Sequence, residues 1–282
     1  MIRPALQDDA LLVDIRESAA TPDQFHLWWL GQSGFLIHWN GHHLLFDPYL
    51  SDSLTEKYAA TDKPHVRMTE RAVDPARLDF IDVVTSSHNH TDHLDAGTLQ
   101  PLLVARRELS LVVSQANLSF AAERLKVPAS RLTGIDVGQD IDCGGFRLAA
   151  IPAAHNDLDQ DENGHFKYIG LVAQFGPFAV YHSGDTLRYE GMTAWLKEWT
   201  IDVALLPING NRPERRVAGN LDGPEAAKLA KDMRARLVVP CHFDMFEFNT
   251  VSPDAFEQSC RAKAQPYRTL QCGERLTVSR AD

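Results

Sequence analysis

One short run of residues holds the side chains best suited to metal chemistry. Residues 87–93 read Ser-His-Asn-His-Thr-Asp-His, so three imidazoles and one carboxylate lie within six positions, directly after the apolar run 80–85. Imidazole binds zinc, iron, manganese or nickel, and a carboxylate adds a hard oxygen ligand. The alternative is a solvated loop that happens to be rich in histidine. The density of ligands and their place after an apolar run favour a metal site.

The spacing within this run predicts two metal positions rather than one. His88 and His90 are two residues apart, so on extended backbone their side chains would point the same way and bind one ion. Asp92 and His93 stand at the turn into a predicted helix and would reach a neighbouring point. We therefore expect two cations close to each other.

The elements that must position these residues alternate between strands and helices. Residues 1–25 are weakly patterned and predict an arm or a short strand, whereas 51–79 are ambiguous. Strands are predicted at 27–30, 35–39, 44–48, 80–85, 109–113, 131–137, 146–151, 168–175, 178–182, 203–206 and 237–240. Helices are predicted at 94–107, 116–125, 223–236 and 253–264.

This order of elements predicts an α/β (α+β) fold whose sheet layers are covered by helices on the outside. No repeat, low-complexity tract or Pro/Gly/Ser linker divides the sequence. We therefore expect a single domain over residues 1–282.

Polar residues follow the ends of five predicted strands. Ligands at the carboxyl ends of strands are typical of an α/β site, so we expect these positions to converge. They are Asp47, the run 88–93, His155, Asp185 and His242.

In the arrangement that we predict, His155 joins His88 and His90 at one metal, and His242 joins Asp92 and His93 at the other. Asp185 bridges the two. Taken alone, His155 and His242 would more often be structural histidines and Asp185 a turn or helix-cap residue. Together with the run 88–93, metal binding is favoured.

The pattern resembles the metallo-β-lactamase superfamily over nearly the whole chain, from residue 47 to residue 242. That resemblance implies a four-layer αββα sandwich. The family's His-x-His-x-Asp-His signature is matched by His88, His90, Asp92 and His93, and its later His, Asp and His by His155, Asp185 and His242. An aspartate at 185 is similar to the hydrolase branches rather than to true β-lactamases, which typically carry Cys there. His90 stands where oxygen-reducing di-iron members have Glu, which argues against that branch.

A finer resemblance is to the branch that contains L-ascorbate-6-phosphate lactonases, carried by residues 87–95, 181–186 and 240–243. It implies a metal-dependent hydrolase that uses a metal-bridging hydroxide to open a small anionic ester or lactone, with Asp92 as a catalytic residue. The cofactors would be two divalent ions, zinc or manganese, with iron as a third candidate. Phosphodiesterases that cleave N-acyl phosphatidylethanolamine share this architecture.

Two other functions stay open: phosphodiester hydrolysis on the same fold, and a non-catalytic metal-binding scaffold. The segment 207–216 follows a strand end, and its arginines could fork onto a phosphate. A solvated surface loop is the slightly favoured alternative for this segment. The candidate substrate contacts are Asn209, Arg212, Arg215 and Arg216.

Charge and composition limit the partners. The formal net charge of −10 argues against an extended nucleic-acid surface. No apolar run reaches the length of a bilayer span, and the first residues lack a secretory signal. The four cysteines lie far apart, which predicts neither a disulfide framework nor a thiolate zinc site. We expect a cytoplasmic protein without nucleic-acid or membrane partners, with a homo-oligomer as an open expectation.

Overall fold

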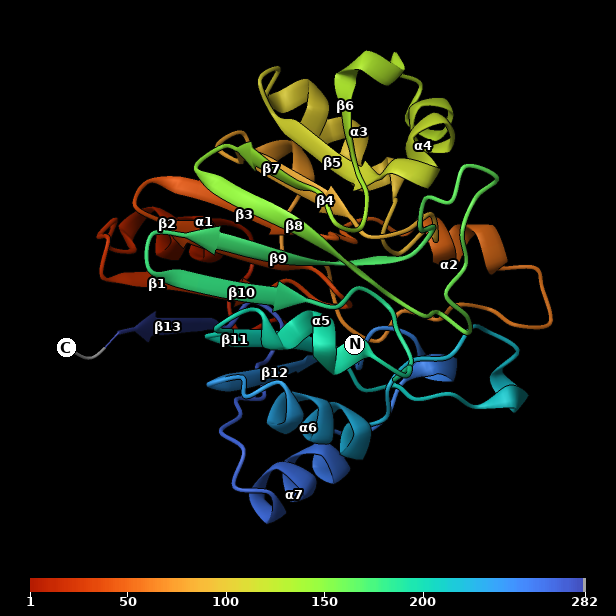
Figure 1. Cartoon of the computed structure of the whole chain (residues 1–282). Helices are drawn as coiled ribbons and strands as arrows, with labels where there is room; N and C mark the ends of the chain where they lie inside the picture. Colours follow the sequence, from red (N-terminus) through yellow and green to blue (C-terminus); the bar gives the residue numbers. More distant parts are fainter. Residues whose placement is uncertain (281–282) are drawn as a thin grey trace.

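Two mixed β-sheets lie face to face, and helices cover their outer faces, in the computed structural model of the chain, which describes residues 1–280 (Figure 1). This arrangement confirms the αββα sandwich expected from the sequence. One sheet holds seven strands and the other holds six.

The first sheet has the order β13-β1-β2-β3-β4-β5-β6. Neighbouring strands are antiparallel from β13 to β3 and parallel from β3 to β6. The strands are β1 (Gln24–Trp29), β2 (Phe35–Trp39), β3 (His42–Phe46), β4 (Val83–Ser86), β5 (Ser110–Ser114), β6 (Leu132–Ile135) and β13 (Arg275–Ser279).

The second sheet has the order β12-β11-β10-β9-β8-β7. Its strands β10, β11 and β12 are parallel, and the pairs β9–β10, β8–β9 and β7–β8 are antiparallel. The strands are β7 (Asp140–Cys143), β8 (Phe146–Pro152), β9 (Ile169–Phe175), β10 (Phe178–His182), β11 (Val203–Pro207) and β12 (Leu237–Cys241).

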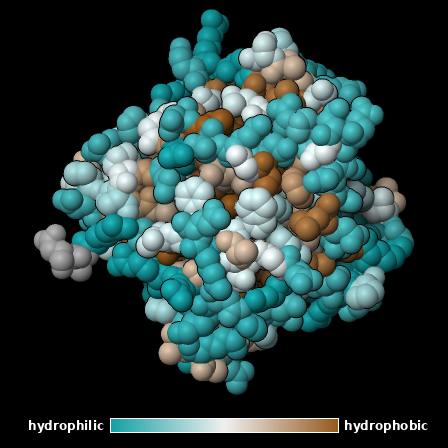
Figure 2. Space-filling view, viewed as in Figure 1, coloured by the Kyte–Doolittle hydropathy of each residue, from teal (hydrophilic) through white to brown (hydrophobic). Residues whose placement is uncertain are grey.

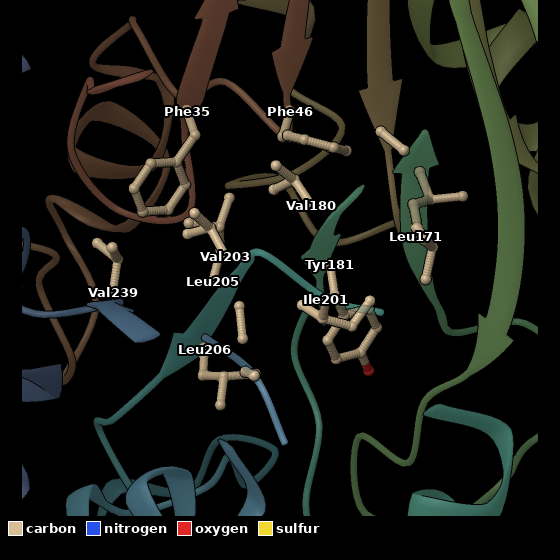
Figure 3. Close-up of a cluster of buried hydrophobic side chains, with 14 of the residues drawn as sticks. Phe35, Phe46, Leu171, Val180, Tyr181, Ile201, Val203, Leu205, Leu206 and Val239 are labelled. Atoms are coloured by element: carbon tan, nitrogen blue, oxygen red, sulfur yellow. The ribbon is translucent and has the colours of Figure 1, made fainter. Parts of the chain in front are cut away.

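The core between the sheets follows from alternation along the strands, since successive side chains point to opposite faces. Leu27 and Trp29 of β1 belong to the inter-sheet cluster, whereas Trp28 belongs to the cluster beneath the outer helices. In the inter-sheet cluster, Phe35 and Phe46 lie opposite Val180 and other residues of the second sheet (Figure 3).

Helices on the two sides have different neighbours. Apolar side chains in the cluster with Trp28 come from three helices: α1 (Asp8–Glu17), α3 (Ala96–Ala105) and α4 (Leu118–Leu125). Three other helices contribute side chains to the cluster that contains the inter-sheet residues: α5 (Met192–Lys197), α6 (Gly223–Asp232) and α7 (Asp254–Ala262). The short helix α2 (Ser53–Tyr58) forms a separate cluster with Tyr49 and Phe246. Single 3-10 turns occur at Pro75–Arg77, Gln115–Asn117, Ala129–Arg131, Pro213–Arg215 and Glu247–Asn249.

Several sequence predictions need correction. The first 25 residues contain the helix α1 instead of an arm or a strand, because Leu11, Leu12 and Ile15 form an apolar side that is buried. The predicted helix 223–236 ends at Asp232, followed by Arg234 with a φ of 61° in the left-handed region. The apolar run 80–85 is strand only from Val83. Among residues 1–280, no helix has the length and apolar character needed to cross a bilayer.

Candidate metal centre

The histidine-rich run forms a compact loop after β4. The expectation of extended backbone at His88 and His90 is wrong, because β4 ends at Ser86 and residues 87–94 form bends and turns. The amide of Leu94 donates to the carbonyl oxygen of His90 at 2.7 Å. Arg124 Nη1 donates to the carbonyl of Asn89 at 2.6 Å and ties the loop to α4. The turn still brings the rings of His88 and His90 together, with centroids 4.7 Å apart.

His88, His90 and His155 form the first ligand group. Each offers one ring nitrogen, and these nitrogens lie within 4.8 Å of one another. His155 follows β8, and its Nδ1 donates to the carbonyl oxygen of Gly219 at 2.9 Å. This hydrogen bond leaves His155 Nε2 for the cluster, 3.2 Å from His90 Nδ1.

Asp92, His93, Asp185 and His242 form the second group, again with ligand atoms within 4.8 Å of one another. The Asp185 carboxylate lies 3.3 Å from His93 Nε2 and 3.2 Å from His242 Nε2. It also lies 3.6 Å from His155 Nε2 of the first group. Asp185 thus has the position that a residue shared between two ions would need.

Asp47 orients one of these ligands from beneath. Its fully buried carboxylate accepts hydrogen bonds from His93 Nδ1 at 2.7 Å, from Thr85 Oγ1 at 2.9 Å, and from both the amide and the hydroxyl of Ser87. Asp47 is itself close enough to His88 and His93 to form a third group of potential ligands. Its four donors instead favour a supporting role that fixes the His93 ring and directs Nε2 toward the second group.

Gln32 is a site residue that the sequence analysis missed. Its Nε2 donates to Asp92 Oδ2 at 2.8 Å and lies 3.0 Å from His242 Nε2. Its carbonyl oxygen accepts from the backbone amide of His242. The only sequence signal was the tight turn 31–34, because a glutamine in a turn has no metal chemistry of its own.

The electrostatics of the two groups differ. Burial disfavours the charged form of every side chain in both groups. In the second group, attraction between the carboxylates and the histidines outweighs this effect of burial. Asp185 and Asp92 raise the pKa of His242 to about 9 and that of His93 well above its usual value. His242 and His93 in turn hold the pKa of Asp185 well below its normal range. In the first group burial dominates and lowers the pKa of His155 to about 4. The second group therefore attracts positive charge, and the first presents neutral imidazoles.

Three buried ligand atoms have no hydrogen-bond partner among the described residues: His88 Nε2, and the pair His93 Nε2 and Asp185 Oδ1, which lie 3.3 Å apart without hydrogen-bond geometry. A buried polar atom left unpaired costs about 1–3 kcal/mol. Three such atoms in two adjacent groups are consistent with cation ligands rather than with a structural hydrogen-bond network. The nitrogen and oxygen donors fit zinc, manganese or iron.

A cavity of about 300 Å³ opens over both groups. His90, Asp92, His155 and Asp185 form one side of it, and α2 with residues from the loop after β12 forms another. Lys57 and Arg124 also line the cavity. Its size suits a small molecule.

The predicted substrate contacts occupy other positions. Arg215 is buried and donates to the carbonyl oxygens of Asn209 and Thr250 and to Asn249 Oδ1, so it holds the loop together. Arg216 pairs with Asp62 at 2.8 Å, and Arg212 is exposed. Neither these three arginines nor Asn209 line the cavity over the two ligand groups, whereas Val217 and Ala218 do.

The comparisons with known proteins agree with this geometry. A family described as "Beta-lactamase superfamily domain" matches residues 42–243, which include all seven candidate ligands. The chain is 26% identical over 255 residues to a UPF0173 metal-dependent hydrolase of Metallosphaera sedula, which covers 89% of this chain and 98% of the relative. It is 28% identical over 258 residues to one of Sulfolobus acidocaldarius, which covers 89% of this chain and 99% of the relative.

Solved structures show the same fold. Igni18, a metallo hydrolase of Ignicoccus hospitalis, superposes with a TM-score of 0.66 at 23% identity and covers 92% of this chain and 100% of that protein. A possible metal-dependent hydrolase of Veillonella parvula gives a TM-score of 0.71 at 14% identity, covering 90% and 99%. The curated relatives that match almost the whole chain are named metal-dependent hydrolases, and the family match over residues 42–243 shows that the chain belongs to the beta-lactamase superfamily.

Proposed function

We propose that the protein is a dinuclear hydrolase that opens a small anionic ester or lactone. The observation that carries this proposal is the position of Asp185, whose carboxylate lies within 3.6 Å of ring nitrogens from both ligand groups, at the side of one cavity. A site for a single ion would not need two adjacent groups with unpaired buried nitrogens in each.

The chain supplies the ligands in two sets. His88, His90 and His155 would hold one cation, and Asp92, His93 and His242 the other, with Asp185 shared between them. Zinc or manganese, when bound here, would lower the pKa of a coordinated water and polarise the substrate carbonyl.

Asp92 is the ligand best placed to handle a proton. It borders the cavity, and its side chain is 16% exposed, against 3% for Asp185. Gln32 holds Asp92 Oδ2, which leaves Oδ1 to orient the attacking water or to accept its proton.

The cavity also favours a negatively charged substrate. Lys57 and Arg124 line it, and two divalent cations would outweigh the two carboxylates of the ligand groups. Among the described contacts, Arg124 donates hydrogen bonds through Nη1 alone, to the carbonyl oxygens of Asn89 and Leu94. An anion that enters the cavity would therefore meet positive charge near the reacting centre.

The test compares metal-reconstituted and metal-stripped protein on lactones, a phosphorylated sugar lactone among them, and on bis(4-nitrophenyl) phosphate. We expect lactone opening that depends on metal, and its loss in Asp92→Asn even with enough added metal to fill the site. Phosphodiester cleavage alone would assign the protein to the phosphodiesterases instead. Bound metal that raises thermal stability without hydrolysis of any substrate would indicate a scaffold.

A further inference from the structure

Beside Leu54 and Lys57 of α2, four aromatic rings line this part of the cavity: Tyr58, His65, Phe246 and Phe248, here called the aromatic wall. The His65 ring is stacked on Tyr58, with centroids 4.2 Å apart and an interplanar angle of 18°. Its centroid lies 4.4 Å from that of Phe248 and 5.3 Å from that of Phe246. His65 thus joins α2 to the loop after β12 in one continuous surface.

Hydrogen bonds hold the central ring of this wall in place. His65 Nδ1 donates to the carbonyl oxygen of Lys63 at 3.1 Å, and Thr55 Oγ1 donates to the carbonyl oxygen of His65 at 2.7 Å. Lys63 Nζ in turn donates to the carbonyl oxygen of Arg216 at 2.9 Å. A surface that is already ordered costs little conformational entropy when a ligand binds, so the wall is pre-organised.

The wall is also uncharged. Burial lowers the pKa of His65, and the donation from Nδ1 leaves the neutral ring with a bare Nε2. Phe246 and Phe248 present only carbon atoms. The cavity is therefore divided into a polar part, with the ligand groups, and an aromatic part, whose nearest charges are Lys57 Nζ, 5.1 Å from the Tyr58 ring centroid, and Lys63 Nζ, 5.7 Å from that of Phe248.

We propose that the aromatic wall binds a flat apolar ring in the non-reacting part of the substrate, so that the natural substrate is an aryl-fused or aryl-substituted ester or lactone. Aromatic rings stack on such groups, whereas the hydroxyl groups of a sugar would lose their water against Phe246 and Phe248 without gaining partners. This inference rests on the proposed function, because the reacting bond must lie at His90, Asp92 and Asp185 while the ring lies against the wall.

Binding of hydrolysis products tests the wall without any turnover. On the full chain loaded with zinc or manganese, isothermal titration calorimetry would compare 2-(hydroxymethyl)phenylacetate with 5-hydroxypentanoate, which share a carboxylate and an alcohol at the same spacing but differ in the benzene ring. We expect the aromatic acid to bind about tenfold more tightly. Equal affinity of the two acids for the unmodified chain would overturn the inference.

Variants of the wall then test whether its rings cause the tighter binding of the aromatic acid. His65→Ala and Phe248→Ala should reduce the ratio of the two affinities to less than about threefold, and His65→Phe should keep it, because a phenyl ring preserves the stack. His42→Phe is the matched control: His42 lies on β3, where its ring stacks with Trp39. A ratio that stays unchanged in both alanine variants would also reject the aromatic wall.

Turnover separates the inference from the proposed function. Isochroman-3-one and δ-valerolactone are six-membered lactones that both release an alcohol and differ in the fused benzene ring, and we expect a higher kcat/KM for isochroman-3-one. If the aromatic acid binds more tightly but neither these two lactones nor the phosphorylated sugar lactone is opened, the aromatic wall stands and the lactonase function is wrong. If both lactones are opened equally and both acids bind equally, the function stands and the wall is rejected.

Discussion

At the residue scale, the site depends most on Asp185, because its carboxylate contacts ligands of both groups. Asp185→Asn keeps the shape but removes the negative charge that the shared position requires. We expect loss of at least one bound cation per chain, and a fall in turnover of at least about a hundredfold. Elemental analysis and a lactone assay would measure the two effects, with Asp161→Asn in a surface loop as control. Full metal content with normal turnover in Asp185→Asn would disprove the shared role.

Gln32 carries a second prediction, as a positioning residue for Asp92 and His242. Gln32→Leu removes the amide that fixes both side chains, so metal affinity should fall by about 10–100-fold while the fold is retained. Competition with a metal-sensitive chelating dye would measure this affinity. The exposed Gln160→Leu is the matched control, and an equal affinity in the two variants would contradict the assignment.

The sequence predicted the candidate ligands more completely than the residues that hold those ligands in place. Imidazoles and carboxylates are recognisable as possible ligands by residue type, so the sequence alone named all seven residues that cluster in the structure, and their binding of metal stays a prediction. The supporting residues became visible only in three dimensions, since Gln32 and Asp92 are 60 positions apart and Asp47 and His93 are 46 apart. Arg215 was misleading for the same reason, because its acceptors lie on segments that the sequence could not place beside it.

At the element scale, the strands that end at the site were predictable because each is a short apolar run with a polar residue beyond its end. The elements missed were those with weak patterns. β13 lies at the edge of its sheet with alternating exposed residues, and α5 has six residues. Local sequence was sufficient to predict the interior strands and the edge strands β6 and β12, whereas β13 and the short helix α5 depend on tertiary contacts.

The helix α6 offers a prediction at this scale. Asp222 accepts from the amide of Glu225 at 2.8 Å, and the Glu225 carboxylate accepts from the amide of Asp222 at 3.0 Å, which is a capping box. Asp222→Ala should lower the free energy of unfolding by about 1 kcal/mol. Urea unfolding would measure it against Asp254→Ala in α7, which lies in the first turn but makes no cap. A loss no larger than in that control would contradict the capping role.

At the scale of the whole molecule, histidines that the folded chain keeps neutral make stability depend on pH. His38 and His43 are stacked with centroids 4.4 Å apart, and Ser18 Oγ lies 2.6 Å from His38 Nδ1. Burial lowers the pKa of both rings, that of His43 to about 3. The unfolded chain takes up these protons near pH 6.5 but the folded chain does not, so stability should fall as the pH drops from 6.5 toward 3.

His43→Phe tests this dependence because it keeps an aromatic ring and removes one titrating group. Its free energy of unfolding should fall less steeply between pH 6.5 and pH 5 than that of the unmodified chain, by up to about 1.4 kcal/mol per pH unit. Urea unfolding at both pH values would show it. Identical pH slopes would mean that His43 does not contribute.

The surface bears on the expected partners. The face in Figure 2 is mostly hydrophilic with small separate apolar areas, and the chain has a net charge of −10. Exclusion of nucleic acid and membrane partners, a cytoplasmic location and the oligomeric state stay predictions from the sequence.

The central claim is that two cations held by this one site perform the hydrolysis. The most direct measurement titrates metal-free protein with manganese or zinc and records lactone opening against the number of cations bound per chain. We predict that activity reaches its maximum only when two cations are bound, and that Asp185→Asn never reaches it. Full activity with a single bound cation, or two bound cations without any hydrolysis, would contradict the account.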